Sequence, residues 1–143
     1  MEKLAALCCL WAFGLGSKED YFKELDRLFL ENPESDFLLE LEDLGGDYTA
    51  AWTRISHLVE CLLNVDVFGK ELFTTLEKVY NENKFTLEEL GEKCYNISCG
   101  LPRSLAFDYP FLSLCYALDE PVFGEMHARE WYQKVFDYYK EKP

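Results

Sequence analysis

The sequence predicts an all-α fold: an irregular bundle of about seven to eight short helices that form a single domain over residues 1–143. Apolar residues recur at helical spacing along most of the chain, whereas strand-like alternation never continues for more than a few residues. Glycine, proline and helix-capping residues divide this pattern into short segments. The length of 143 residues suits one hydrophobic core, and no internal repeat is apparent.

The apolar residues 4–13 begin the chain, and we expect them to form a buried helix. A signal peptide is the alternative, but Lys3 is the only positive charge that precedes the apolar run, and Glu2 offsets it. No clean small-residue cleavage site follows the run, which is also too short to cross a bilayer. The segment is therefore expected to belong to the folded domain.

Three further starts are predicted in the first half of the chain from capping residues. Ser17 precedes an amphipathic stretch and is expected to be the N-cap of the second helix. Asn32 and Pro33 predict the start of a third helix, because Asn is a good cap and proline is favoured at the first helical position. We expect this helix to end near Leu44, before two glycines, and Asp47 to cap the fourth.

In the second half, the expected caps are Asp66 for the fifth helix and Thr86 for the sixth. Thr86 and Glu89 have the spacing of a capping box, in which the two residues each bond the other's backbone N–H. Residues 96–108 are expected to form a loop or one short helical turn. Pro110 can open a further helix that ends near residue 118, and a strongly amphipathic last helix is expected over about residues 124–141.

The net charge of −13, from 27 acidic and 14 basic residues, restricts the classes of partner. Nucleic acid is excluded, because its phosphates would be repelled and the sequence has no basic stripe. Anionic membrane surfaces are disfavoured for the same reason. The charge favours fast association with a basic protein, so we expect a basic protein partner and a cytoplasmic location.

Six cysteines, at positions 8, 9, 61, 94, 99 and 115, are expected to be reduced thiols in a reducing compartment. Cys8, Cys9 and Cys115 lie within apolar runs, where cysteine behaves as a small hydrophobic residue. A chain of this size needs no disulfide to fold. Whether Cys94 and Cys99, on either side of a four-residue segment, are bonded is left open.

The strongest local feature is acidic: no lysine or arginine occurs between Arg27 and Arg54. In the predicted third helix, Phe37, Leu41 and Leu44 are expected to face the core, with Leu38 at the edge of that face. Leu39 would then project among carboxylates, as an apolar anchor within a charged surface that suits a basic partner. The predicted partner-binding residues are Glu34, Asp36, Leu39, Glu40, Glu42 and Asp43.

Two histidine pairs are candidates for chemistry. His57 and Cys61 lie one helical turn apart, but no cysteine-nucleophile signature accompanies them. His127 and Glu130 have a spacing found in metal sites, yet such sites use further ligands that the sequence does not supply. The sequence therefore predicts no catalytic residue, no metal site and no cofactor. An enzyme that combines carboxylates with a histidine stays an alternative.

The stretch 28–42, LFLENPESDFLLELE, resembles segments of small acidic helical immunity proteins, which are encoded beside bacterial contact-dependent and related polymorphic toxins. The resemblance implies a cytosolic inhibitor that binds one toxin domain, often a nuclease, and blocks its active site or substrate path. It assigns no binding residue. The second alternative to this function is a self-associating structural or adaptor domain, whose sign would be an exposed patch of Trp131, Tyr132 or Tyr138 in the last helix.

Overall fold

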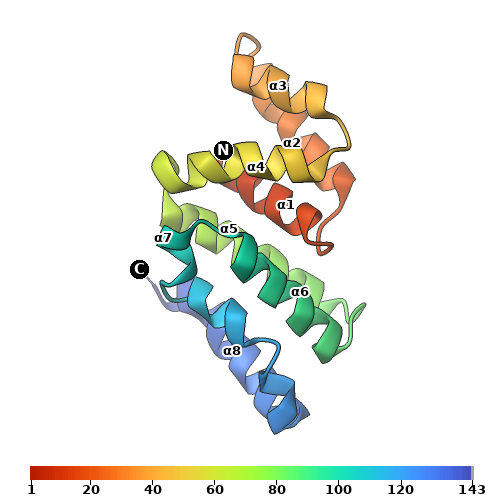
Figure 1. The fold of residues 1–143 in the computed structure, drawn as a ribbon, viewed down its shortest axis with the longest axis vertical. Helices are drawn as coiled ribbons and strands as arrows, with labels where there is room; N and C mark the ends of the chain where they lie inside the picture. The colour runs from red at the N-terminus through yellow and green to blue at the C-terminus, as the bar shows by residue number, and fades with distance from the viewer. Residues whose placement is uncertain (143) are drawn as a thin grey trace.

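The computed structural model describes residues 1–142, which fold into helices joined by short connections (Figure 1). The α-helices are α1 (Glu2–Ala12), α2 (Lys18–Glu31), α3 (Asp36–Leu44), α4 (Tyr48–Cys61), α5 (Val65–Asn81), α6 (Leu87–Gly100), α7 (Arg103–Ala106) and α8 (Glu125–Glu141). Two 3-10 helices, η1 (Phe111–Tyr116) and η2 (Glu120–Phe123), lie between α7 and α8. No strand occurs in this described part, and the prediction of an all-α bundle of short helices is confirmed.

Three of the predicted caps form as expected. The Ser17 hydroxyl accepts a hydrogen bond of 3.1 Å from the backbone N–H of Asp20, at the start of α2. The Asp47 carboxylate accepts a similar bond of 3.0 Å at the start of α4. At α6, Thr86 and Glu89 form the complete capping box, with bonds of 3.1 and 3.2 Å. These ends are fixed by contacts between residues three positions apart, which the sequence alone can reveal.

The start of α3 differs from the prediction. The helix begins at Asp36, and Ser35 is its N-cap, with its hydroxyl accepting a bond of 3.3 Å from the Leu38 N–H. Asn32 instead ends α2, because its backbone N–H donates to the Leu28 carbonyl at 3.0 Å. Because Asn32 is the C-cap of α2, the N-cap of α3 is Ser35, the next residue whose side chain can accept this bond.

The start of α5 also differs, because Asn64 rather than Asp66 is the cap. The Asn64 amide oxygen accepts a bond of 3.1 Å from the Val67 N–H. Asp66 lies in the first turn, where an acidic side chain favours the positive end of the helix dipole. Its carboxylate is 2.8 Å from the Lys142 ammonium group, which links α5 to the end of α8.

Two expectations for residues 96–118 were wrong. The sixth helix continues to Gly100, into the segment expected to be a loop or one turn, and the short α7 is the one helical turn in the rest of that segment. The segment that follows Pro110 forms the 3-10 helix η1 rather than an α-helix. The buried apolar positions fit this form: Phe111 and Leu114 of η1, and Ala117 directly after it, are at most 1% exposed and lie three residues apart. That repeat places them on one face of a 3-10 helix.

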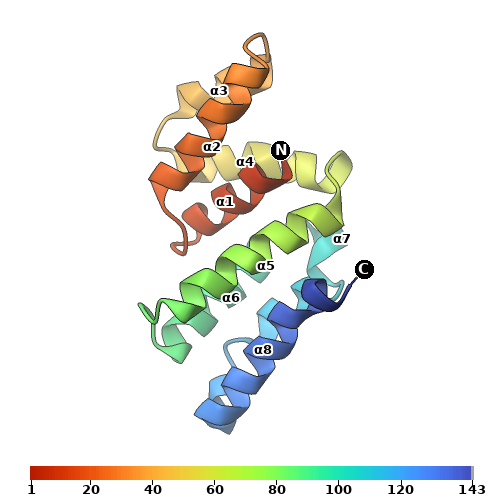
Figure 2. The ribbon, with the colours of Figure 1, turned by 180° about the vertical axis from the view of Figure 1, so that it is seen from behind.

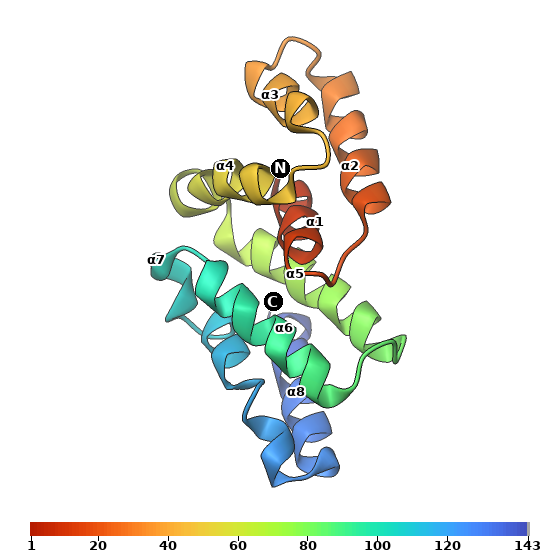
Figure 3. The same cartoon turned by 45° about the vertical axis from the view of Figure 1, so that its right-hand side comes forward.

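Helix α1 lies at the centre of the packing, against α2, α4 and α5 (Figure 2). Its buried residues include Leu4, Ala5, Ala6, Cys8, Cys9 and Leu10, so the expected burial of this segment is confirmed. One hydrophobic cluster continues from α1 through α5 to α8. Helix α3 packs mainly on α2 and α4 and lies at the opposite end of the molecule from α8 (Figures 1 and 3). Within residues 1–142, no helix has both the length and the apolar content needed to span a membrane.

All six cysteines are free thiols, which settles the open question of Cys94 and Cys99: the first is buried, the second is exposed, and they are not bonded. Burial raises the pKa of Cys8 and of Cys94 to about 12. A thiol with so high a pKa carries almost no thiolate at neutral pH, so these cysteines are packing residues. Cys61 is also exposed.

Candidate functional site

Helix α3 is attached to the molecule by an apolar face. Leu38 is 3% exposed and Leu41 is fully buried, whereas Phe37 and Leu44 are only partly buried. Leu38 therefore lies near the centre of the buried face, and the prediction that it lies at the edge was wrong. This orientation of α3 decides which of its carboxylates reach solvent.

Three of the predicted partner-binding carboxylates are exposed. Glu34 lies just before α3, Asp36 begins it and Asp43 lies near its end. None of the three forms an ion pair within 4.0 Å in the part of the chain that the structure describes. Leu39 lies on the same helix and is 49% exposed. We call Glu34, Asp36, Leu39 and Asp43 the α3 surface: an apolar side chain among carboxylates that form no ion pair.

Glu40 is exposed but paired. Its carboxylate lies 3.0 Å from the Arg54 guanidinium of α4, and both side chains are about half exposed. Such a pair contributes little to stability, because water and salt screen it and two long side chains must be ordered. Its effect on the surface is larger, since Arg54 offsets one negative charge at the α4 side of α3.

Glu42 is half-buried, so it does not share the open surface with the other carboxylates. Burial raises the pKa of Glu42, and so do a hydrogen bond to Asp26 of α2 and the negative charges of Asp26 and Asp43. Two carboxyl groups at one seam disfavour each other's ionised form. Glu42 therefore lies at the contact between α2 and α3, which we call the α2–α3 seam. The six predicted residues do not form one uniform face.

Leu30 was not predicted to be a surface residue, yet it is the most exposed large apolar side chain of α2, at 83%. It lies next to the turn into α3, where residues 31–35 line a hollow of about 360 Å³. Leu30 falls outside the apolar spacing of α2, whose buried residues include Tyr21, Leu25 and Leu28. That mismatch is visible in the sequence and could have identified Leu30 as a second apolar side chain close to the α3 surface.

The two histidines do not assemble the candidate sites. His57 and Cys61 are both exposed on α4. The His127 Nε2 atom lies 2.5 Å from a Glu120 carboxylate oxygen of η2, so its nearest acidic partner is not Glu130. Across residues 1–142, no group of three or more His, Cys, Asp or Glu side chains is arranged to hold a metal ion.

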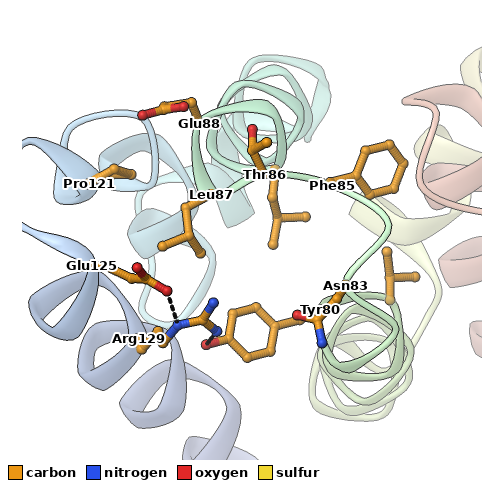
Figure 4. A pocket seen from close by; sticks show the side chains of 11 residues that line it. Tyr80, Asn83, Phe85, Thr86, Leu87, Glu88, Pro121, Glu125 and Arg129 are labelled. Atoms are coloured by element: carbon orange, nitrogen blue, oxygen red, sulfur yellow. Dashed lines mark hydrogen bonds and ion pairs between the residues drawn. The ribbon is translucent and has the colours of Figure 1, made fainter.

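A cavity of about 360 Å³ lies between the end of α5, the start of α6, η2 and the start of α8 (Figure 4). The Arg129 guanidinium donates to Glu125 at 3.0 Å and to the Tyr80 hydroxyl at 3.1 Å, as the figure shows for Glu125. Glu88 is the other carboxylate at this cavity, and neither histidine lines it. Arg129 and Glu125 pair with each other, so Glu88 is the only carboxylate of the lining without an ion pair, and no histidine lies beside it.

The expected sign of self-association through α8 is not found. Tyr132 is 1% exposed, and Trp131 and Tyr138 are partly buried against the core. The aromatic stripe of the last helix is therefore core, which follows from its packing on α5. Apart from Tyr95 of α6, the large exposed apolar residues of the second half of the chain lie between α6 and the start of α8, at Phe107, Tyr109, Tyr116, Leu118, Val122, Phe123 and Met126.

Comparison of the chain with known protein families, with curated proteins and with solved structures finds no match. Its function is therefore argued from the surfaces and cavities of the chain itself.

Proposed function

We propose that this protein is an acidic cytoplasmic inhibitor that binds and neutralises a basic protein, in the manner of a bacterial immunity protein that masks a nucleic-acid-directed toxin domain. One observation carries the proposal: Leu39 is half exposed on the same short helix as the unpaired carboxylates of Asp36 and Asp43, with Glu34 just before it. The helix lies at one end of the molecule (Figure 3), where a partner can approach it without contacting the rest of the fold.

The α3 surface has the two components that such an interface needs. The carboxylates present negative charge where the partner would otherwise bind phosphates, and this charge accelerates and orients the encounter. Leu39 supplies apolar area that is removed from water in the complex, which slows dissociation. A partner that binds nucleic acid through a basic groove would be inhibited because the same groove is occupied.

Glu40 and Glu42 have supporting roles in this proposal. Glu40 already pairs with Arg54, which offsets its charge and weakens its attraction for a cation of the partner. Glu42 is partly protected by α2, so it adds to the field of the surface more than to direct contact. The direct contacts are therefore assigned to Glu34, Asp36, Leu39 and Asp43.

The proposal is tested by capture on the immobilised protein from a lysate of its own host, at low and at high salt, with bound proteins identified by mass spectrometry. We expect one basic protein that is retained at low salt and released at high salt. Salt screens the attraction between exposed charges, which extends only about 10 Å at 0.1 M and less at higher concentrations. The purified partner should lose its activity when this protein is added. A captured protein that keeps full activity in the complex would rule out the inhibitor function.

A further inference from the structure

A second cavity, of about 440 Å³, lies where α1, α2 and α5 meet. Figure 2 shows these three helices side by side on one side of the molecule. The cavity is lined by Lys3, Leu7, Asp20, Lys23, Glu24, Arg27, Thr75 and Lys78. Four of these eight residues are cationic, in a chain that has only 14 basic residues against 27 acidic ones. Its volume lies within the range of about 300–1,000 Å³ that small-molecule sites occupy.

Three of the four cations form no direct ion pair in the described residues. Lys3, Lys23 and Lys78 form no ion pair within 4.0 Å anywhere in residues 1–142. They come from three different helices, so only the tertiary fold brings them to one cavity. Lysines from three helices that line one cavity give it local positive charge on an acidic protein, and a bound anion would be attracted to that charge.

The acidic residues of the cavity do not cancel this charge. Glu24 is only 6% exposed, and Arg27 donates to its two carboxylate oxygens at 2.5 to 3.2 Å. Arg27 also donates to Glu31 at 2.7 Å, so its positive charge is offset by two carboxylates of α2. Asp20 is the one remaining carboxylate of the lining, opposed to three unpaired lysines, and Thr75 adds a neutral hydroxyl donor.

We propose that this cavity is a binding site for a small soluble anion that carries phosphate groups. Several ammonium groups and a hydroxyl donor suit phosphate oxygens, which accept charge-assisted hydrogen bonds from many directions. The ligand must be small, because an extended polyanion such as nucleic acid would meet the surrounding surface of a protein with net charge −13. The site is separate from the α3 surface and does not depend on the inhibitor function.

Inorganic pyrophosphate is the probe for this site, titrated into the full chain and followed by calorimetry and by the amide NMR signals of α1, α2 and α5. The cavity variant combines Lys23→Gln and Lys78→Gln. The matched control combines Lys70→Gln and Lys134→Gln, because both lysines are exposed, unpaired and outside the cavity lining, and the net charge changes equally. We expect saturable binding that is weakened about tenfold or more in the cavity variant and is nearly unchanged in the control.

Thermal unfolding gives an independent reading, since a ligand that binds only the folded state raises Tm. Pyrophosphate should raise the Tm of the wild type and of the control by similar amounts, and that of the cavity variant by clearly less. Equal weakening in both variants, or no saturable binding to the wild type, would overturn the proposal. Vesicles of phosphatidylcholine with added phosphatidic acid form a second arm: binding to them without binding to pyrophosphate would also overturn the assignment of a soluble ligand.

Discussion

At the scale of single residues, Glu42 illustrates how packing divides an acidic stretch into groups with different chemistry. Periodicity alone places Glu42 with Asp36, Glu40 and Asp43 on the outer side of one helix. In the fold, α2 covers this side chain partly and brings Asp26 next to it, which raises the pKa of Glu42. The exposed carboxylates could be predicted from helical spacing, because it depends only on local geometry. The Asp26 contact could not, because it depends on how α2 and α3 pack.

The raised pKa of Glu42 predicts the direction in which stability changes with pH, and this direction can be tested. Above its folded-state pKa, ionised Glu42 destabilises the fold, and this penalty is removed as the pH falls through that pKa and protonation occurs preferentially in the folded state. Glu42→Gln should therefore raise the free energy of unfolding at neutral pH, by on the order of 1 kcal/mol, with a smaller gain at acidic pH. Urea denaturation at the two pH values measures it.

The control for this variant is Glu34→Gln, because Glu34 is exposed and unpaired. It should change the free energy of unfolding by no more than about 0.5 kcal/mol at either pH, as is usual for surface positions. A Glu42→Gln protein that is less stable than wild type at neutral pH would show that the seam between α2 and α3 stabilises the ionised carboxylate instead of penalising it.

At the scale of helices, the sequence predicted the N-cap correctly where one candidate residue was available, and wrongly where two candidates lay close together. Ser17, Thr86 and Asp47 each form the predicted cap. At α3 and α5, two candidate caps lie within three residues of each other, and the neighbouring structure selects Ser35 and Asn64. Similarly, a proline start after Pro110 is compatible with either helix type, so the sequence could not distinguish an α-helix from the 3-10 helix that buries Phe111 and Leu114.

A substitution at Gly91 tests how closely α6 packs against the end of η1. A Cβ atom at this position would lie 2.5 Å from the Ala117 carbonyl oxygen and 3.1 Å from its carbonyl carbon, and backbone atoms cannot move aside cheaply. Gly91→Ala gains up to about 1 kcal/mol of helix propensity, but overpacking costs about 1–3 kcal/mol. We expect a net loss of stability of about 1 kcal/mol or more, seen as a lower Tm.

Gly46→Ala is the matched control for Gly91→Ala. A Cβ atom there meets only the Lys18 ammonium group, at the ordinary contact distance of 3.7 Å. This variant should unfold close to the wild-type temperature. If Gly91→Ala were as stable as Gly46→Ala, α6 and η1 would have to be packed less closely than the structure shows.

At the scale of the whole molecule, the composition gives the net charge, whereas only the fold shows where the charges lie. The charge of −13 is visible in the sequence and already disfavours nucleic acid as a partner. The separation of charge into an acidic end at α3 and a cationic cavity between α1, α2 and α5 is not visible there. Lys3, Lys23 and Lys78 are far apart along the chain, and no periodicity relates them. Only the order in which the helices stack brings them together.

Binding of the basic partner is proposed to depend on the α3 surface rather than on acidity in general. Two charge reversals separate these possibilities when their association kinetics with the captured partner are compared at low and high salt. One variant combines Glu34→Lys, Asp36→Lys and Asp43→Lys. The other combines Glu60→Lys, Glu92→Lys and Glu130→Lys, exposed carboxylates on α4, α6 and α8 that give the same change in net charge.

We expect the α3 variant to associate about tenfold or more slowly at low salt, while the control variant associates almost as fast as the wild type. The difference should shrink as salt screens the surface. Circular dichroism establishes that both variants keep their helical content. Equal slowing in both variants would contradict the proposed interface, because the partner would then respond to net charge alone, and unchanged association of the α3 variant would place the interface on another face of the molecule.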